Sequence, residues 1–82
     1  MSYQETTSTQ LREILNSGVV RFNFRKKDGS IRNALGTRNL DLIPKWTSPK
    51  HLEDISNTSI VYFDLEEQNY RSFCTNAEVA VL

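Results

Sequence analysis

The residues best suited to chemistry in this 82-residue chain are its arginines, because four of the six lie within one stretch of eighteen residues. Guanidinium groups suit the planar, two-point recognition of phosphates and of guanine edges. Aromatic side chains elsewhere in the chain offer flat surfaces on which nucleobases can stack. The sequence therefore predicts an anion-binding surface, with the candidate ligand-binding residues Arg21, Arg25, Arg32, Arg38, Trp46, Tyr70 and Arg71.

The same residues also have a structural interpretation. Arginines that alternate along a strand can form a solvated face, and Trp46 and Tyr62 can belong to the core. Residues 1–50 carry a net charge of +5 and residues 51–82 a net charge of −5, so the whole chain is neutral. This polarity fits an anionic ligand, self-association between unlike surfaces, or neutralisation of the two halves within one fold.

The arginine-rich stretch has the pattern of a β-hairpin. Asp28-Gly29 stands between two strand-forming runs, and Asp-Gly favours a two-residue loop in a type I′ turn. Such a loop places Arg25 opposite Arg32, Lys27 opposite Ser30 and Phe22 opposite Leu35. One face of the hairpin is then expected to be apolar, with Phe22, Phe24, Ile31 and Leu35. The other face is expected to carry Arg21, Asn23, Arg25, Arg32, Ala34 and Gly36, with Arg38 flanking it.

Groups that could support catalysis or bind a metal are few. His51 is the only histidine and Cys74 the only cysteine, so neither a metal site nor a disulfide is expected. Cys74 falls in a predicted strand, where a free cysteine usually serves as a small apolar side chain. The acidic pairs Glu53-Asp54 and Glu66-Glu67 fall in predicted turns and on helix surfaces. We therefore expect a protein that is not an enzyme and that needs no cofactor.

The pattern along the chain predicts one domain, residues 1–82, with a short helix followed by about five strands. The helix is expected at about residues 9–17, capped by Ser8 or Thr9 and ended by a left-handed Gly18. After the hairpin, Leu40, Leu42 and Ile43 are expected to plug the core before Pro44. Ser48-Pro49 could begin a helical turn in the long connection that follows. No run of residues is long and apolar enough to span a bilayer, so we expect an intracellular protein.

A second hairpin and a terminal strand complete the predicted fold. Ser59–Asp64 and Tyr70–Cys74 alternate as strands, and Ala77–Leu82 forms the last one. A four-residue loop, Glu66–Asn69, places Asp64 opposite Arg71 as an ion pair and Tyr62 opposite Phe73 as an aromatic pair. One helix and about five short strands indicate a mainly β fold, a small and partly open β-barrel.

Several short motifs resemble a family of small phage proteins with an SH3-like (Sm-like) β-barrel, sometimes described as a second group of WYL-type domains. The resemblance covers residues 19–81, from the hairpin onward. Tyr70 departs from the pattern, since the family often has Trp there. The matching pieces are Lys26–Ser30, Gly36-Thr37, Ile43-Pro44, Val61–Asp64 and Tyr70–Phe73.

The resemblance implies a function that the residues alone do not. The chain also resembles a T-even-type phage protein of this family that counters the CBASS immunity of bacteria by binding 3′,3′-cyclic GMP-AMP and sequestering it uncleaved. By this resemblance we expect a cyclic-dinucleotide-binding homo-oligomer in the host cytoplasm, with no membrane or metal partner. A general nucleic-acid-binding barrel and an inhibitor that pairs a strand such as Ala77–Leu82 with a host protein are the alternatives.

Overall fold

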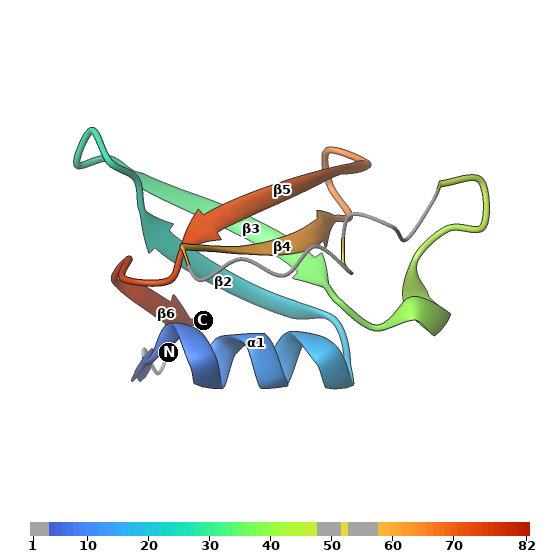
Figure 1. The fold of residues 1–82 in the computed structure, drawn as a ribbon, viewed down its shortest axis with the longest axis horizontal. Coiled ribbons are helices and arrows are strands. Elements are labelled where there is room, and N and C mark those ends of the chain that lie inside the picture. Colours follow the sequence, from blue (N-terminus) through green and yellow to red (C-terminus); the bar gives the residue numbers. More distant parts are fainter. Residues whose placement is uncertain (1–3, 48–51, 53–57) are drawn as a thin grey trace.

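The fold was obtained as a computed structural model, which describes residues 4–47, 52 and 58–82. A short helix and six strands make up most of this part of the chain (Figure 1). In chain order the elements are β1 (Gln4–Thr6), α1 (Ser8–Ser17), β2 (Val20–Arg25), β3 (Ile31–Thr37), the 3-10 turn η1 (Leu40–Leu42), β4 (Ser59–Asp64), β5 (Asn69–Cys74) and β6 (Val79–Val81).

The six strands form one antiparallel sheet in the order β1-β6-β2-β3-β4-β5. β3 and β4 pair over only two residues each, at their C-terminal ends, so the sheet bends sharply there and does not close. This arrangement confirms the predicted mainly β, partly open fold with one N-terminal helix. β1 is an addition that the polar N-terminal sequence did not indicate, and it pairs with β6.

β6 lies between β1 and β2 and is paired on both sides. It is also shorter than predicted, Val79–Val81 rather than Ala77–Leu82. The expectation that this strand is exposed and available to a host protein is therefore wrong. The strands at the two edges of the described sheet are β1 and β5.

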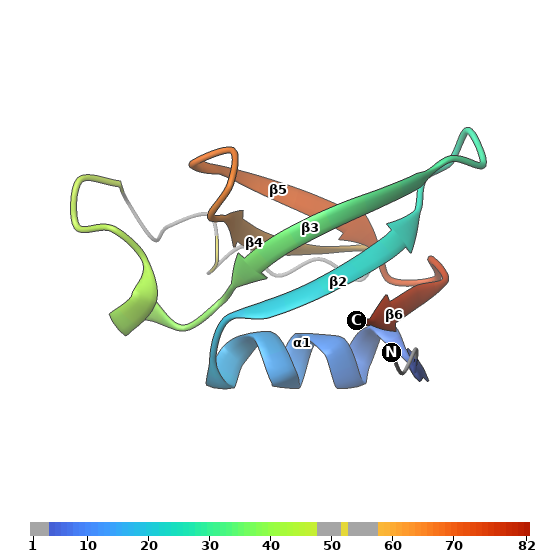
Figure 2. The same cartoon turned by 180° about the vertical axis from the view of Figure 1, so that it is seen from behind.

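Helix α1 runs along one side of the sheet, beside β2 and β6 (Figures 1 and 2). It starts earlier than predicted, because Thr7 accepts a hydrogen bond from the Gln10 backbone while the Gln10 side chain bonds back to Thr7. Leu11 and Leu15 are fully buried against the sheet. Gly18 follows the helix in an extended conformation, with φ 178°, so the predicted left-handed cap is wrong.

The β2–β3 hairpin has a three-residue loop in place of the predicted two-residue loop. Gly29 N–H donates to the Lys26 carbonyl at 3.0 Å, and Lys26 N–H donates to the Ser30 carbonyl at 2.8 Å. Gly29 alone in the loop has a positive φ, 91°, as in a type I turn followed by a left-handed residue. The Asp28 carboxylate accepts from the backbone and hydroxyl of Ser30 and stabilises this loop.

The longer loop shifts the register by one residue, and the predicted faces of β3 are therefore wrong. Arg25 pairs with Ile31 and Phe24 with Arg32. A shift by one exchanges the two faces of a strand. Arg32 lies on the same face as Phe24, whereas Arg25 lies on the other face. The side chains that the prediction had assigned to an apolar face, Ile31 and Leu35, are half or partly exposed.

The β4–β5 hairpin also differs in register, but by two residues, so its faces are as predicted. Asp64 pairs with Asn69 and Tyr62 with Arg71, across a loop of residues 65–68. The turn begins directly after Asp64 because its carboxylate accepts from the Glu66 and Glu67 backbone N–H groups, each at 3.0 Å. The predicted ion pair of Asp64 with Arg71 is confirmed at 3.8 Å, as a diagonal neighbour.

Strand β4 separates two apolar clusters. Tyr62 faces the main core, which holds Phe22 and Phe73 and is covered by α1. The predicted ring contact of Tyr62 with Phe73 is confirmed, with 5.9 Å between ring centroids. Phe63 points to the opposite side, where Ile43 and Leu52 pack on it.

Turn η1 contributes less to the core than predicted. Leu40 and Leu42 are exposed, and Ile43 alone of the three apolar residues is buried. The predicted helical turn from Ser48-Pro49 lies outside the described residues, as does His51.

Candidate anion-binding groove

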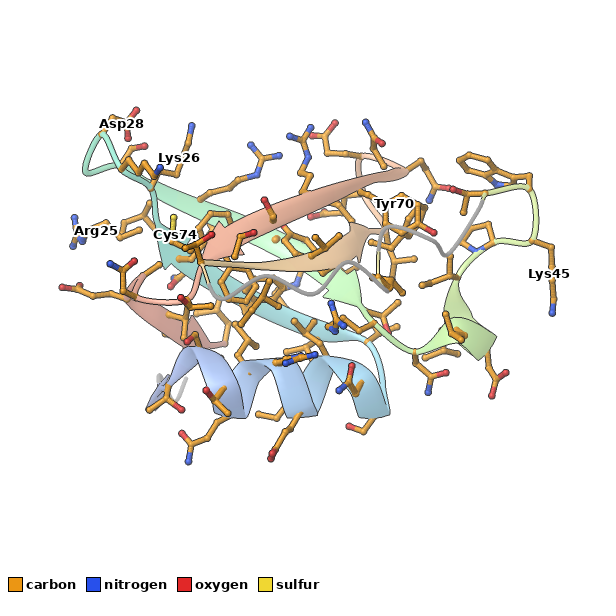
Figure 3. All side chains as sticks on the ribbon, in the orientation of Figure 1. Arg25, Lys26, Asp28, Lys45, Tyr70 and Cys74 are labelled. Atoms are coloured by element: carbon orange, nitrogen blue, oxygen red, sulfur yellow. The ribbon has the colours of Figure 1, made fainter. Side chains whose placement is uncertain are left out.

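A groove of about 810 Å³ opens between the end of the β2–β3 hairpin and strand β5. Its volume lies within the range of about 300–1,000 Å³ that is typical of small-molecule sites. Figure 3 shows Lys26 and Cys74 at the hairpin end of the molecule and Tyr70 at the other end of β5. The lining residues, which together we call the groove, are Phe24, Arg25, Lys26, Lys27, Asp28, Arg32, Thr58, Ser59, Tyr70, Arg71, Ser72, Phe73 and Cys74.

Positive charge dominates the groove although the chain as a whole is neutral. Among the described residues that line it, Asp28 alone is acidic, and hydrogen bonds from Ser30 hold the pKa of that carboxyl below its usual range. The groove is therefore a local region of positive potential on a neutral molecule. Five cationic side chains border it: Arg25, Lys26, Lys27, Arg32 and Arg71.

Arg32 and Arg71 enter the groove from two strands that are not neighbours in the sheet. Each has an acidic partner at a long distance: Arg32 Nη2 lies 4.0 Å from Glu67 Oε1, and Arg71 Nε lies 3.8 Å from Asp64 Oδ2. These separations exceed a hydrogen bond, so the pairs are loose and the guanidinium groups can accept a closer anion.

The other three cations stand at the hairpin tip. Arg25 is held in place, since its Nε lies 3.3 Å from Glu78 Oε2 and its Nη1 donates to the Gly29 carbonyl at 2.7 Å. Lys26 and Lys27 form no ion pair with a residue in the described ranges. The hairpin loop thus presents two ammonium groups beside a guanidinium that is fixed by the fold.

The fold brings four of the seven predicted ligand-binding residues to this groove: Arg25, Arg32, Tyr70 and Arg71. The grouping differs from the predicted arginine face, because Arg25 and Arg32 lie on opposite faces of the hairpin. Arg71 had been predicted as an ion-pair partner across β4–β5, and it is both that and a groove residue.

Arg21, Arg38 and Trp46 are not among the residues that line the groove. Arg21 forms an exposed ion pair with Glu66 at 3.8 Å. Trp46 is 69% exposed and contacts the edge of Phe63.

Arg38 holds neighbouring segments of the fold together. Its guanidinium donates to the Asn16 side chain, the Val61 carbonyl and the Leu52 carbonyl. Burial of the guanidinium, with a smaller contribution from Arg12, lowers the pKa of Arg38. These bonds join α1, β4 and the segment after η1.

Tyr70 borders the groove, but its ring packs edge-on against Phe63, with 5.1 Å between centroids. It lies on the face of β5 opposite to Arg71, because successive residues of a strand alternate. Phe24, predicted on the apolar face of the first hairpin, and Phe73, predicted as the aromatic partner of Tyr62, form the apolar wall on the Arg71 side. Arginine side chains can themselves stack on nucleobases, so Arg32 and Arg71 can supply that contact.

Sequence reasoning missed Lys26 and Lys27 as candidate ligand-binding residues. Both belong to the turn that was correctly located, and their positive charge beside Asp28 was visible in the sequence. Ser72, Thr58 and Ser59 were missed as well, and no local signal distinguishes them from ordinary strand residues.

Within the described ranges, no group of three His, Cys, Asp or Glu side chains is placed to hold a metal ion. No helix there has the length and apolar character needed to cross a membrane.

Comparison with known proteins places the chain in a family. Residues 8–77 match the family described as WYL_2, Sm-like SH3 β-barrel fold, and this match includes α1, which the resemblance had left outside. The chain is also 35% identical, over 78 residues, to a protein of Enterobacteria phage T4 described as an uncharacterized 11.5 kDa protein in the Gp31-cd intergenic region. That alignment covers 87% of this chain and 76% of the T4 protein. No solved structure matches the chain. The chain belongs to the WYL_2 family of Sm-like SH3 β-barrel proteins, as a phage protein with this domain.

Proposed function

We propose that this protein binds a cyclic dinucleotide second messenger of the 3′,3′-cyclic GMP-AMP class and sequesters it without cleavage, which blocks CBASS immunity. The observation that carries the proposal is the concentration of five cationic side chains around one groove of a neutral chain. Positive charge gathered in this way favours a compact ligand that carries more than one negative charge.

The cations fall into two groups, which suits a ligand with two phosphates. Arg32 and Arg71 form one group on the strands, and Arg25, Lys26 and Lys27 form the other at the hairpin tip. A cyclic dinucleotide carries its two phosphodiesters on opposite sides of one ring. Each phosphate can therefore meet one group of cations, while the bases lie against the apolar wall.

The choice of sequestration over hydrolysis rests on the family resemblance. The location in the host cytoplasm, where such messengers are made, rests on the same argument. We further propose that the binding unit is a homo-oligomer, since a ligand with near two-fold symmetry is readily bound between identical subunits. Light scattering after size exclusion, with and without ligand, measures the number of subunits.

The direct test is isothermal titration with 3′,3′-cyclic GMP-AMP, followed by mass spectrometry of the ligand released on denaturation. We expect stoichiometric binding and release of the intact ligand. Arg32→Gln should weaken binding about tenfold or more, because a charge-assisted hydrogen bond is lost. Arg12→Gln is the matched control, since Arg12 is exposed on α1 and lies outside the groove. Absence of binding at micromolar protein contradicts the proposal.

A second candidate ligand is single-stranded nucleic acid, because the groove extends along β5 and combines basic with apolar residues. Binding of this kind weakens steeply as salt rises and tolerates many sequences. A salt titration with short oligonucleotides therefore separates the two candidates. Tight oligonucleotide binding with a steep salt dependence, and no preference for the cyclic dinucleotide, would favour the nucleic acid.

A further inference from the structure

Two arginines that line the groove, and the tyrosine that pairs with one of them across β4 and β5, carry buried hydrogen-bond donors with no acceptor among the described residues. They are the hydroxyl of Tyr62, the Nε of Arg32 and the Nε of Arg71. Buried polar groups in folded proteins are nearly always hydrogen-bonded, so each exception asks for an explanation. Three exceptions in one place indicate a missing acceptor.

The three donors come from three different strands, and the fold brings them together. Tyr62 and Arg71 are direct partners across β4 and β5. The Tyr62 ring lies across Gly36, as Cε2 would stand 3.1 Å from a Cβ there. Arg32 lies four residues before Gly36 in β3, on the same face.

The Tyr62 hydroxyl lies in the field of both arginines. Burial and the nearby Asp64 raise the pKa of Tyr62 to about 12, while Arg32 and Arg71 act in the opposite direction. The hydroxyl therefore stays protonated at neutral pH and remains a donor. Tyr62 itself is fully buried, and the two arginines whose charges act on its hydroxyl belong to the lining of the groove.

We propose that Tyr62, Arg32 and Arg71 form a subsite for one phosphoryl group, with the Tyr62 hydroxyl as a hydrogen-bond donor to a phosphate oxygen. The loose ion pairs of the two arginines allow the phosphate to enter between them and to accept from all three groups. A tetrahedral phosphate offers several acceptor oxygens in different directions, which suits donors that arrive from β3, β4 and β5. The inference rests on the proposed function in taking the ligand to carry phosphate.

The decisive variant is Tyr62→Phe, which removes one oxygen and keeps the ring and its contacts with Phe22 and Phe73. Among the described residues the hydroxyl donates to no acceptor, so its removal should leave the melting temperature unchanged or raise it. In the complex it should raise the dissociation constant about tenfold to a hundredfold, the range for a hydrogen bond to a charged group. A purely structural role would not produce these opposite effects.

Two probes separate this inference from the proposed function. The first is 3′,3′-cyclic GMP-AMP by calorimetry. The second is inorganic pyrophosphate, followed through the arginine Nε–H signals in NMR spectra of wild type and Tyr62→Phe. We expect pyrophosphate to shift the Arg32 and Arg71 signals in the wild type and to bind more weakly to the variant.

Each outcome bears on one of the two proposals. Pyrophosphate binding that depends on Tyr62, without cyclic dinucleotide binding, supports the subsite and overturns the proposed ligand. Equal affinity of wild type and Tyr62→Phe for both probes overturns the subsite, even if the cyclic dinucleotide binds, and would mean that a water molecule satisfies the hydroxyl. Failure of the wild type to bind either probe overturns the subsite as well.

Discussion

Tyr62 of β4 lies directly across the backbone of Gly36 in β3. A Cβ atom on Gly36 would stand 2.5 Å from Cδ2 of the Tyr62 ring and 3.1 Å from the Phe63 carbonyl oxygen. Because Gly36 has no side chain, the Tyr62 ring can lie over the β3 backbone at the point where β3 and β4 pair. The groups that approach Gly36 most closely are therefore this ring and this carbonyl.

Gly36→Ala should therefore destabilise the fold by about 1–3 kcal/mol, the usual range for an overpacked core. Gly18→Ala is the matched control, because no atom of the described residues lies within 4 Å of its Cβ position and its backbone is extended. That variant should be neutral or slightly stabilising. Urea unfolding of both variants measures the difference. Equal stability of the two would mean that Tyr62 does not lie across Gly36.

Gly29→Ala should destabilise the hairpin, because Gly29 has a φ of 91° that other residues rarely adopt. We expect a loss of about 1 kcal/mol, and a smaller loss for Gly29→Asn, since Asn tolerates positive φ. Thermal unfolding compares the two variants. The NMR contact between the α-protons or amides of Arg25 and Ile31 reports the register independently. A contact pattern that pairs Arg25 with Arg32 would contradict the three-residue loop.

Arg38→Gln should reduce stability while leaving ligand affinity unchanged, in contrast to Arg32→Gln. The Arg38 guanidinium joins three segments through its bonds to Asn16, Val61 and Leu52. Loss of these bonds should lower the free energy of unfolding by about 2–3 kcal/mol. Urea unfolding gives this value, and calorimetry on the folded variant gives the affinity. A loss of affinity without a loss of stability would mean that Arg38 binds the ligand instead of stabilising the fold.

Stability should fall in alkaline solution through the ionisation of Tyr62. Burial, aided by Asp64, raises the pKa of Tyr62 to about 12, whereas a tyrosine in the unfolded chain ionises near 10. Between these two values the unfolded chain has lost the proton and the folded chain has kept it. The folded protein therefore keeps its full stability with respect to this ionisation below about pH 10, and it loses stability as the pH rises from about 10 to about 12.

The loss in the free energy of unfolding amounts to about 2.7 kcal/mol at most, because one pKa unit corresponds to about 1.36 kcal/mol. Tyr62→Phe should remove the alkaline fall in the free energy of unfolding that belongs to this residue. Ultraviolet titration of tyrosinate should show one fewer tyrosine with a high pKa in Tyr62→Phe than in the wild type. A wild type in which every tyrosine ionises near pH 10 without unfolding would contradict the buried position of Tyr62.

Local signals determined much of this fold. A short helix was predicted at about residues 9–17, where α1 lies, and alternation predicted β4 with its correct bounds. Asp28-Gly29 located the first turn. Such patterns are readable because helix and strand periodicities act on neighbours in the chain.

Local sequence patterns did not predict the registers of the two hairpins. In β4–β5 the error was two residues, so Tyr62, Asp64 and Arg71 remained on one face as predicted. In β2–β3 the error was one residue, and Arg32 moved to the face of Phe24. The bonds of Asp28 to Ser30 and the left-handed Gly29 together select the three-residue loop, and the Asp-Gly pair by itself is compatible with both loops.

The sequence by itself therefore determined the fold class, the main elements and the excess of arginine near the first hairpin. The tertiary structure alone decided which of those arginines meet. Arg32 and Arg71 are 39 positions apart in the chain, and they share a groove because the sheet bends where β3 pairs briefly with β4. Contacts between strands so distant in sequence depend on register and sheet curvature, which are set by packing across the whole core.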